Sequence, residues 1–392
     1  MLSALRTLAA TAASASLLLY GPTAPPIRDR QQWVLNAINA EQAWTVSKGK
    51  GVIVAVIDSA VDTRTPELRN KVTVAPDMST ALFDRDGVTP GAHGTAMASL
   101  IAGSGADQGL IGVAPEARVL SVPVAVEQEP GRNMVAPEED LLTSRDSPLA
   151  RAIRYAANHG AKVISMSIGT YGPHLSEREA VAYALERGVV LVAAVGNDGQ
   201  TKYAKEKDTS YWSFPAGYSG VIGVSAVDRR GKRAPFSSDN LSVQVAAPGV
   251  DVPVARMGGG YALAEGTSGA AALVAGVAAL IKARHPALAP DEVALALSAS
   301  ARGRPAAGYD DQIGFGVVDA AAALNKAETL EGVGRQVDVP EGRHFGAGED
   351  SPQPSRPGPE PWKLWVYTAG ALAGLAAFGG SVAVLSRRDR RS

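Results

Sequence analysis

The sequence contains no cysteine, and only five of its 392 residues are histidine. Without cysteine the chain can form neither a disulfide nor a thiolate nucleophile, and it has no cysteine ligand for zinc. The His-Glu-x-x-His pattern of many zinc peptidases is missing, and the acidic residues are too scattered to suggest a calcium cage. A formal net charge of −1 at pH 7 gives no reason to expect nucleic-acid binding. We therefore expect neither a metal nor another cofactor.

One stretch that is present, Gly266–Leu273, places a serine where a glycine turn meets a long helix of alanine, valine and leucine. Ser268 would stand in the first turn of that helix, at the positive end of the helix dipole. The first backbone N–H groups of a helix have no partner within the helix and can hold an oxyanion. This context favours Ser268 as a nucleophile, and the alternative is that Ser268 only caps the helix.

Two earlier segments offer the partners that a nucleophilic serine needs. His93 stands at the start of a second glycine-framed helix, Gly91–Gly103, and Asp58 ends the apolar run Val52–Asp58. The other histidines are less suited to act as a general base, because two stand at expected helix ends, one in a loop and one in a proline-rich tail: His159, His285, His174 and His344. The sequence thus predicts a triad in the order Asp58, His93, Ser268.

Apolar strands alternate with helices through the middle of the chain. We expect strands at residues 52–58, up to 122, and at 162–168, 189–195, 221–227 and 243–246, with helices at 92–103, 149–158, 176–187 and from 268. Continuously apolar strands are typical of a parallel sheet that is covered on both faces, so the fold class is a doubly wound α/β domain. Its chemistry should gather at the carboxyl ends of the strands, where Asp58 and Asn197 fall.

The N-terminal part predicts export. Residues 1–24 have one arginine, Arg6, before an Ala/Leu-rich run, which is typical of a secretory signal peptide. Residues 25–49 form an arm in which Trp33, Ile38 and Trp44 recur at helical spacing. The main domain then occupies residues 50–335. Its polar insertion at residues 127–147 either flanks the substrate cleft or is idle surface.

The C-terminal part predicts a membrane anchor. A proline-rich linker at 336–361 is followed by a transmembrane helix at 362–386 and a basic tail at 387–392. The uncharged stretch Leu364–Leu385 is long enough to cross a bilayer, which takes about 20 residues. Arginines follow this stretch, so the positive-inside rule places the tail in the cytoplasm and the main domain outside. We expect a single-pass protein of the cell membrane.

Residues 50–325 resemble the subtilisin-like serine peptidases, the S8 family. Beyond the three triad segments, the resemblance rests on Ile111–Pro115, Ser165–Gly169, Val192–Asn197, Phe214–Ala216, Val245–Gly249 and Gly314–Asp319, all in family order. The signal, short arm, proline-rich stalk, single span and basic tail are similar to the mycosins, the membrane-anchored subtilases associated with type VII secretion. The disulfides associated with mycosins cannot form in this chain, because it lacks cysteine.

The resemblance implies a role for each site residue. Ser268 attacks a peptide carbonyl, His93 takes its proton, and Asp58 holds the imidazolium. Asn197 donates its side-chain amide to the oxyanion. An extended edge that pairs with the substrate backbone consists of Ser165, Met166, Ser167, Ile168 and Gly169. The walls of the first specificity pocket consist of Ala193, Ala194, Val195 and Gly196. The substrate is then an exported polypeptide, and a type VII secretion complex is an expected partner.

The sequence departs from the family pattern near all three triad residues. Ser59-Ala60 follows Asp58 where the family has Thr-Gly, Ser99 replaces a common glycine, and Gly269 with Ala272 replaces the common Met and Pro. No catalytic atom is lost, so these changes bear on the rate and on the shape of the cleft.

Two other functions compete with an endopeptidase. The first is a structural component of a membrane secretion complex, in which the protease fold serves mainly as a scaffold. The second is an esterase of the α/β-hydrolase type. The sequence disfavours this one because the Gly-x-Ser-x-Gly elbow is absent and the triad order differs.

Overall fold

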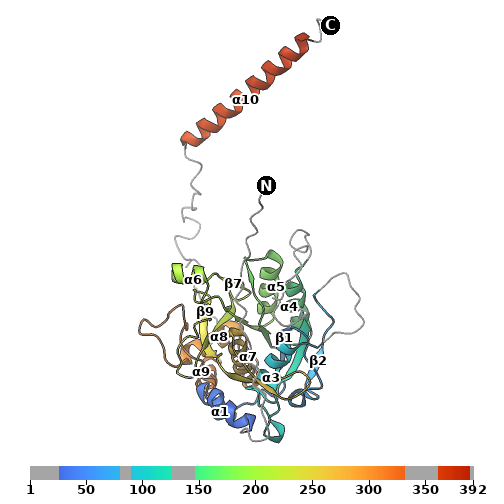
Figure 1. Ribbon diagram of the computed structural model, residues 1–392, viewed down its shortest axis with the longest axis vertical. Coiled ribbons are helices and arrows are strands. Elements are labelled where there is room, and N and C mark those ends of the chain that lie inside the picture. The colour runs from blue at the N-terminus through green and yellow to red at the C-terminus, as the bar shows by residue number, and fades with distance from the viewer. Residues whose placement is uncertain (1–25, 80–89, 125–145, 332–360, 389–392) are drawn as a thin grey trace, which may run out of the picture. The chain divides into compact units, whose positions relative to one another are not determined.

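The computed structural model describes residues 26–79, 90–124, 146–331 and 361–388. The chain divides into two compact units, residues 1–333 and 334–392. The first unit is built on a seven-stranded sheet with the order β2-β3-β1-β4-β6-β8-β9, in which every neighbouring pair is parallel (Figure 1). The expected α/β class with a mostly parallel sheet is therefore confirmed.

The elements of the sheet lie close to the expected ranges. Its strands are β1 (Ile53–Asp58), β2 (Val72–Val74), β3 (Arg118–Pro123), β4 (Val163–Met166), β6 (Val190–Ala194), β8 (Val221–Val227) and β9 (Val243–Pro248). The helices that pack on them are α3 (Ala92–Ala102), α4 (Pro148–Asn158), α5 (Leu175–Glu186) and α7 (Thr267–Arg284). Apolar side chains alternate between the two faces of each strand, so each face has its own hydrophobic core.

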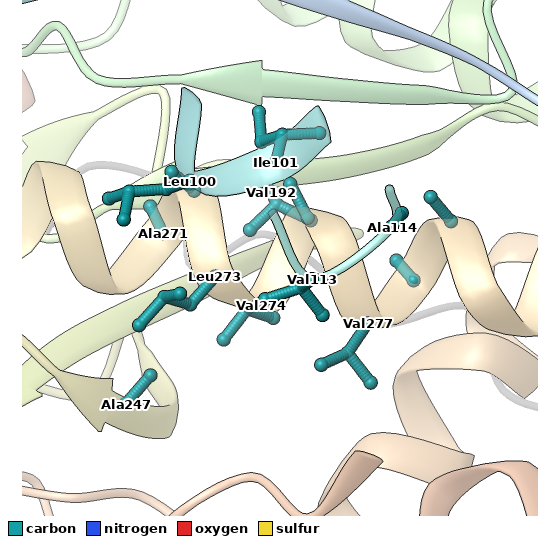
Figure 2. Close-up of a cluster of buried hydrophobic side chains, with 14 of the residues drawn as sticks. Leu100, Ile101, Val113, Ala114, Val192, Ala247, Ala271, Leu273, Val274 and Val277 are labelled. Carbon is teal, nitrogen blue, oxygen red and sulfur yellow. The ribbon is translucent and has the colours of Figure 1, made fainter. Parts of the chain in front are cut away.

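Helix α7 is the centre of the larger core. It packs against β4, β6, β8, β9 and α3, and Figure 2 shows Leu273, Val274 and Val277 among Leu100, Val113 and Val192. Within the described part of the chain, α7 is the one helix that is long and apolar enough to cross a membrane by length and composition. Since nearly all of its side chains are buried among these strands, α7 is the core helix of a globular domain.

The N-terminal arm consists of two short helices, α1 (Ile27–Ala37) and α2 (Ala40–Ala43). The helical spacing expected for the arm is thus present, in two helices separated by Asn39, which adopts a left-handed conformation with φ of 55°. The arm is held by long-range hydrogen bonds. The Gln31 side chain bonds both backbone groups of Ile111, the Trp44 indole donates to the Val113 carbonyl, and the Ala320 N–H donates to the Ile38 carbonyl.

Several small elements have no counterpart in the sequence analysis. They are the antiparallel hairpin β10 (Val252–Ala255) and β11 (Tyr261–Ala264), the two-stranded pair β5 (Thr170–Tyr171) and β7 (Ser213–Phe214), and the helices α6 (Lys202–Lys207), α8 (Pro290–Ser300) and α9 (Ala320–Leu330). The expected signal peptide, most of the 127–147 insertion and nearly all of the linker lie outside the described residues. In the second unit, α10 (Pro361–Arg388) covers the uncharged stretch Leu364–Leu385.

Candidate active site

Asp58 and His93, far apart in the sequence, form a hydrogen-bonded pair. Asp58 is the last residue of β1, and His93 lies in the first turn of α3. The Nδ1 atom of His93 is 2.8 Å from both carboxylate oxygens of Asp58. The Asp58 side chain is completely buried, whereas 33% of the His93 side chain is exposed. A buried carboxylate on Nδ1 fixes the ring and leaves its Nε2 edge toward the accessible side.

The turn after Asp58 explains why Ser59 and Ala60 are compatible with this pair. The Ser59 N–H donates to Asp58 Oδ1 at 2.7 Å, and the Ser59 hydroxyl accepts the N–H of Gly94 at 3.0 Å. A Cβ at Gly94 would overlap the Ser59 carbonyl oxygen, so this close approach of α3 to the turn requires glycine. Ala60 does not adopt a positive φ, so the turn has no need of the glycine that the family uses there.

Ser268 is the second residue of α7. The helix is preceded by Gly266, whose φ of 146° suits glycine, and Gly266 occupies the N-cap position. Because the N-cap is Gly266, Ser268 is not the residue that caps α7, and that alternative is wrong. The Ser268 carbonyl accepts the Ser167 hydroxyl at 3.5 Å, which brings the end of β4 to the start of α7.

Asn197 follows β6 and is oriented by Thr267. Its side-chain oxygen accepts both the N–H of Thr267 at 3.0 Å and the Thr267 hydroxyl at 3.1 Å. A Cβ at Gly266 would lie 3.6 Å from Asn197 Nδ2 and 3.8 Å from the Ser268 backbone nitrogen. Two N–H donors therefore border the same small space, which is the arrangement an oxyanion needs. Thr267 did not emerge from the sequence analysis, because only the fold places it against Asn197.

Several residues of the candidate site lie at the carboxyl ends of neighbouring strands. Ile57 of β1 is paired with Met166 of β4, and Met166 is paired with Ala193 of β6. The chain therefore leaves the sheet at Asp58, Ser167 and Asn197 on one edge, as expected of a parallel α/β sheet. The part of the expected substrate-binding set that lies within the strands or directly after them is buried: Ser165, Met166, Ser167, Ala193, Ala194 and Val195. Ile168, Gly169 and Gly196 lie nearer the surface.

Two further departures from the family pattern, Ser99 and Gly269, are accommodated by the packing around them. The Ser99 hydroxyl donates to the Ala96 carbonyl at 2.6 Å and accepts the N–H of Ala255 at 3.1 Å, so it joins α3 to β10. A Cβ added at Gly269 would meet only the side chain of Leu100, at an ordinary contact distance of 3.6 Å. These residues therefore adjust packing between elements and leave the Asp58–His93 pair unchanged.

A second carboxylate, Asp62, stabilises the loop that follows Asp58. Its N–H donates to the Thr95 hydroxyl at 2.9 Å, and its carboxylate accepts the N–H of Gly258 at 3.1 Å and a bond from Arg64. Burial alone would raise the pKa of Asp62, but the hydrogen bonds from Arg64 and Gly258 outweigh burial and hold that pKa below its ordinary value. Asp62 thus links the Asp58 loop to α3 and to the β10–β11 hairpin. Within the described ranges, no three acidic or histidine side chains could hold a metal ion.

Comparisons with known proteins agree with this geometry. The sequence model of the subtilase family matches residues 49–316. Fervidolysin from Fervidobacterium pennivorans is 34% identical over 322 residues, which cover 74% of this chain but only 43% of fervidolysin. Among solved structures, MycP1 from Mycobacterium smegmatis is 29% identical with a TM-score of 0.61, covering 80% of this chain and 87% of MycP1. The MycP3 protease from the type VII (ESX-3) secretion system is 31% identical with a TM-score of 0.63, covering 79% and 91%.

Proposed function

Because the chain belongs to the subtilase family, we propose that it is a serine endopeptidase that cleaves polypeptides through an acyl-enzyme. The observation that carries the proposal is the Asp58–His93 pair, with 2.8 Å between carboxylate and imidazole, at the sheet edge where α7 begins. The chain spans less than half the length of fervidolysin, so this proposal concerns the shared domain.

Each residue has a defined role in the proposed reaction. His93 accepts the Ser268 proton as the hydroxyl attacks the peptide carbonyl, and Asp58 stabilises the imidazolium that forms. The tetrahedral oxyanion is held by the backbone N–H of Ser268 and by the side-chain amide of Asn197, which the two bonds to Thr267 orient. His93 then gives its proton to the leaving amine, and water releases the acyl group by the same steps in reverse.

The substrate backbone is proposed to lie along the segment that continues β4. Residues 167–169 extend past the end of that strand, and Ile168 and Gly169 are less buried than the residues within it. An extended peptide can add to such an edge through main-chain hydrogen bonds, which carry no sequence preference. Selectivity must then come from the space beside residues 193–197.

A labelling experiment tests the proposed nucleophile. A fluorophosphonate probe should label the full chain, and Ser268→Ala should abolish the label while the circular dichroism spectrum stays the same. Thr45→Ala is the control, because the Thr45 hydroxyl bonds only within the arm, and it should label as the wild type does. A Ser268→Ala protein that still reacts at one serine would contradict the assignment.

We also propose that the domain is exported and tethered to the outer face of the cell membrane. Support comes from the signal-like residues 1–24, from the uncharged Leu364–Leu385 within α10, and from the arginines that follow it. The test is protease protection in cells. External proteinase should remove the domain while an epitope placed after Ser392 survives, and loss of that epitope in intact cells would contradict the orientation.

Likeness to MycP3, a protease from a type VII secretion system, favours a second candidate function. In that reading the domain is a structural component of a secretion complex and its proteolysis is secondary. The two functions separate when Ser268→Ala is compared with a deletion of the whole gene. Secretion that fails only in the deletion supports the structural role, whereas secretion that fails equally in both supports the endopeptidase.

A further inference from the structure

The edge of the sheet opposite the candidate active site has a concentration of positive charge. The whole chain has a formal net charge of −1, so such a concentration is not a matter of overall composition. Five exposed cationic side chains lie where β1, β3 and β4 begin and where α7 ends: Lys48, Lys50, Arg118, Lys162 and Arg284. We call these five residues the basic edge.

Three of the five residues precede or begin neighbouring strands. Arg118 begins β3 and is paired with Ile53 of β1, whose carbonyl accepts the Lys162 N–H at 2.9 Å. Lys162 directly precedes β4, and Lys50 lies shortly before β1. Because these strands are parallel, their starts share one edge, opposite to the edge where Asp58 lies.

A cavity of about 310 Å³ joins this edge to the end of α7. Lys48, Lys50 and Arg284 line the cavity, together with Trp44 and Val46. The Val46 side chain is 51% exposed, although it is apolar. The cavity thus combines three cations with an aromatic ring and an apolar side chain in contact with water.

The charge of the basic edge is not neutralised by neighbouring carboxylates. Among the residues that the structure describes, none of the five cations belongs to an ion pair. Glu116 is the one carboxylate that lines the cavity, against three cations. Like charges held together without counter-charges repel each other, so this edge attracts an anionic surface or ligand.

The chain leaves the domain beside the basic edge. Glu331 is the C-cap of α9, and its carboxylate is 2.6 Å from Nδ1 of His285, which directly follows Arg284. Residues 332–360 then lead to α10. A tether at one point does not by itself decide which face of the domain meets a bilayer, whereas a charged face beside that point can.

On the basis of the proposed membrane tether, we propose that the basic edge docks on anionic phospholipid headgroups. Lysine and arginine are attracted to an anionic membrane surface within about one Debye length. Trp44 is of the residue type enriched at membrane–water interfaces, and the cavity beside it admits a headgroup phosphate between Lys48, Lys50 and Arg284. A lipid surface is favoured over an acidic polypeptide because the tether would concentrate the domain at the bilayer.

Docking by the basic edge orients the candidate active site. Helix α7 runs from the edge that has Ser268 to the edge that has Arg284, and its 18 residues span about 27 Å. The catalytic edge therefore faces away from the bilayer by about that distance. An exported polypeptide reaches it without first approaching the lipid.

The absence of cysteine allows a direct test, because Val46→Cys gives the chain a single thiol for a nitrobenzoxadiazole fluorophore. The labelled full chain is reconstituted into nanodiscs of phosphatidylcholine alone, or of equal parts phosphatidylcholine and phosphatidylglycerol, each with a headgroup-quenched lipid. Quenching should occur only with phosphatidylglycerol, and it should disappear in about 1 M salt, where the Debye length is about 3 Å. A fluorophore at Leu175→Cys, a position that is 61% exposed at the start of α5, should not be quenched.

Charge reversal then identifies the residues. The combined change Lys48→Glu, Lys50→Glu and Arg284→Glu should abolish quenching at Val46→Cys. Each cation near an anionic surface strengthens the attraction about fivefold, so the ratio of docked to free domain should fall at least about 100-fold. The matched control reverses the same number of charges on α6, which follows β6 on the side of the active site, and it should be quenched normally: Lys202→Glu, Lys205→Glu and Lys207→Glu.

The outcomes separate the inference from the proposal on which it rests. A Val46→Cys label that is never quenched, that is quenched equally in both nanodiscs, or that stays quenched after reversal of the basic edge overturns the inference. Reversal-sensitive binding of a labelled octaglutamate peptide without any quenching by phosphatidylglycerol also overturns it, in favour of an acidic polypeptide partner. A full chain that is not recovered with nanodiscs contradicts the tether itself. The circular dichroism spectrum checks that the reversal variants fold, and the lipid and salt comparisons decide the matter without them.

Discussion

Two histidines in this domain bond a carboxylate through Nδ1, and their burial is opposite. In the Asp58–His93 pair the carboxylate is completely buried and 33% of the imidazole is exposed, with 2.8 Å between the groups. In the His285–Glu331 pair the imidazole is 2% exposed and the carboxylate 47% exposed, with 2.6 Å between them. His93 lies in the first turn of α3, at the edge of the sheet. His285 is the C-cap residue of α7, at the opposite end of α7 from Ser268.

The difference fits the proposed role of the first pair and a structural role for the second. A general base must reach the substrate, so its ring needs an accessible edge while the orienting carboxylate stays in a fixed, dry site. His285 is buried at the end of α7 and bonds a carboxylate that is half in water, so this pair has no accessible imidazole. The distance between the two groups does not distinguish the pairs. What distinguishes them is which partner is buried, the carboxylate in the first pair and the imidazole in the second.

The largest effect on kcat/KM is expected when either Ser268 or His93 is replaced. Ser268→Ala and His93→Ala should each lower kcat/KM for peptide hydrolysis by a factor on the order of 10⁶, because triad members act as a unit. Glu331→Ala, which breaks only the second pair, should leave kcat/KM unchanged. Steady-state kinetics on folded protein measures all three, and strongly unequal losses for Ser268 and His93 would contradict a shared mechanism.

A smaller effect is expected when the buried carboxylate is made neutral. Asp58→Asn keeps the shape of the side chain but favours the wrong imidazole tautomer, so kcat should fall by about 10⁴-fold. The matched change Glu331→Gln should leave kcat unchanged, because His285 lies outside the site. If Asp58→Asn retained most of its activity, Asp58 would have no role in orienting His93.

The oxyanion donor should contribute less than the triad. Asn197→Ala removes the side-chain amide and should lower kcat by about 10²–10³-fold, with KM nearly unchanged, because the bond forms only as charge develops. Thr267→Val keeps the shape of Thr267 and removes its hydroxyl bond to Asn197, so it should cost less than Asn197→Ala. An effect of Asn197→Ala on KM alone would place Asn197 in substrate binding instead.

The smallest expected effect is on the stability of the protein when the His285–Glu331 pair is broken. Glu331→Ala leaves the buried His285 without its carboxylate, and the free energy of unfolding should fall by about 1 kcal/mol, since one partner is half exposed to water. The midpoint of urea denaturation measures this change, and kcat/KM is measured on the same protein. A loss of activity larger than the loss of folded protein would show that this end of α7 communicates with the site.

The sheet and the segments that carry Asp58 and His93 could be predicted from the sequence because both have local signals. The run ending in Asp58 is apolar at every position and became β1, and the glycine-framed helix at His93 became α3 within a residue. Continuous apolar runs and glycine turns are set by neighbours in the chain, so they can be seen without coordinates.

The parts that escaped prediction depend on contacts between distant segments. The hairpin β10–β11 has a glycine tip and short strands, which give little periodicity to detect. The orientation of Asn197 depends on Thr267, which lies 70 residues further along the chain. The division of the arm into α1 and α2 depends on the left-handed conformation of Asn39, which the spacing of Trp33, Ile38 and Trp44 does not reveal.

The late position of α7 in the chain has a consequence for biosynthesis. In the proposed mechanism, Ser268 and Thr267, which orients Asn197, both lie at the start of α7, whereas Asp58 and His93 come from the first third of the domain. A chain synthesised only as far as β9 would then hold the proposed base without the proposed nucleophile. Under that mechanism, catalytic competence therefore requires α7 to have packed against β4, β6, β8 and β9.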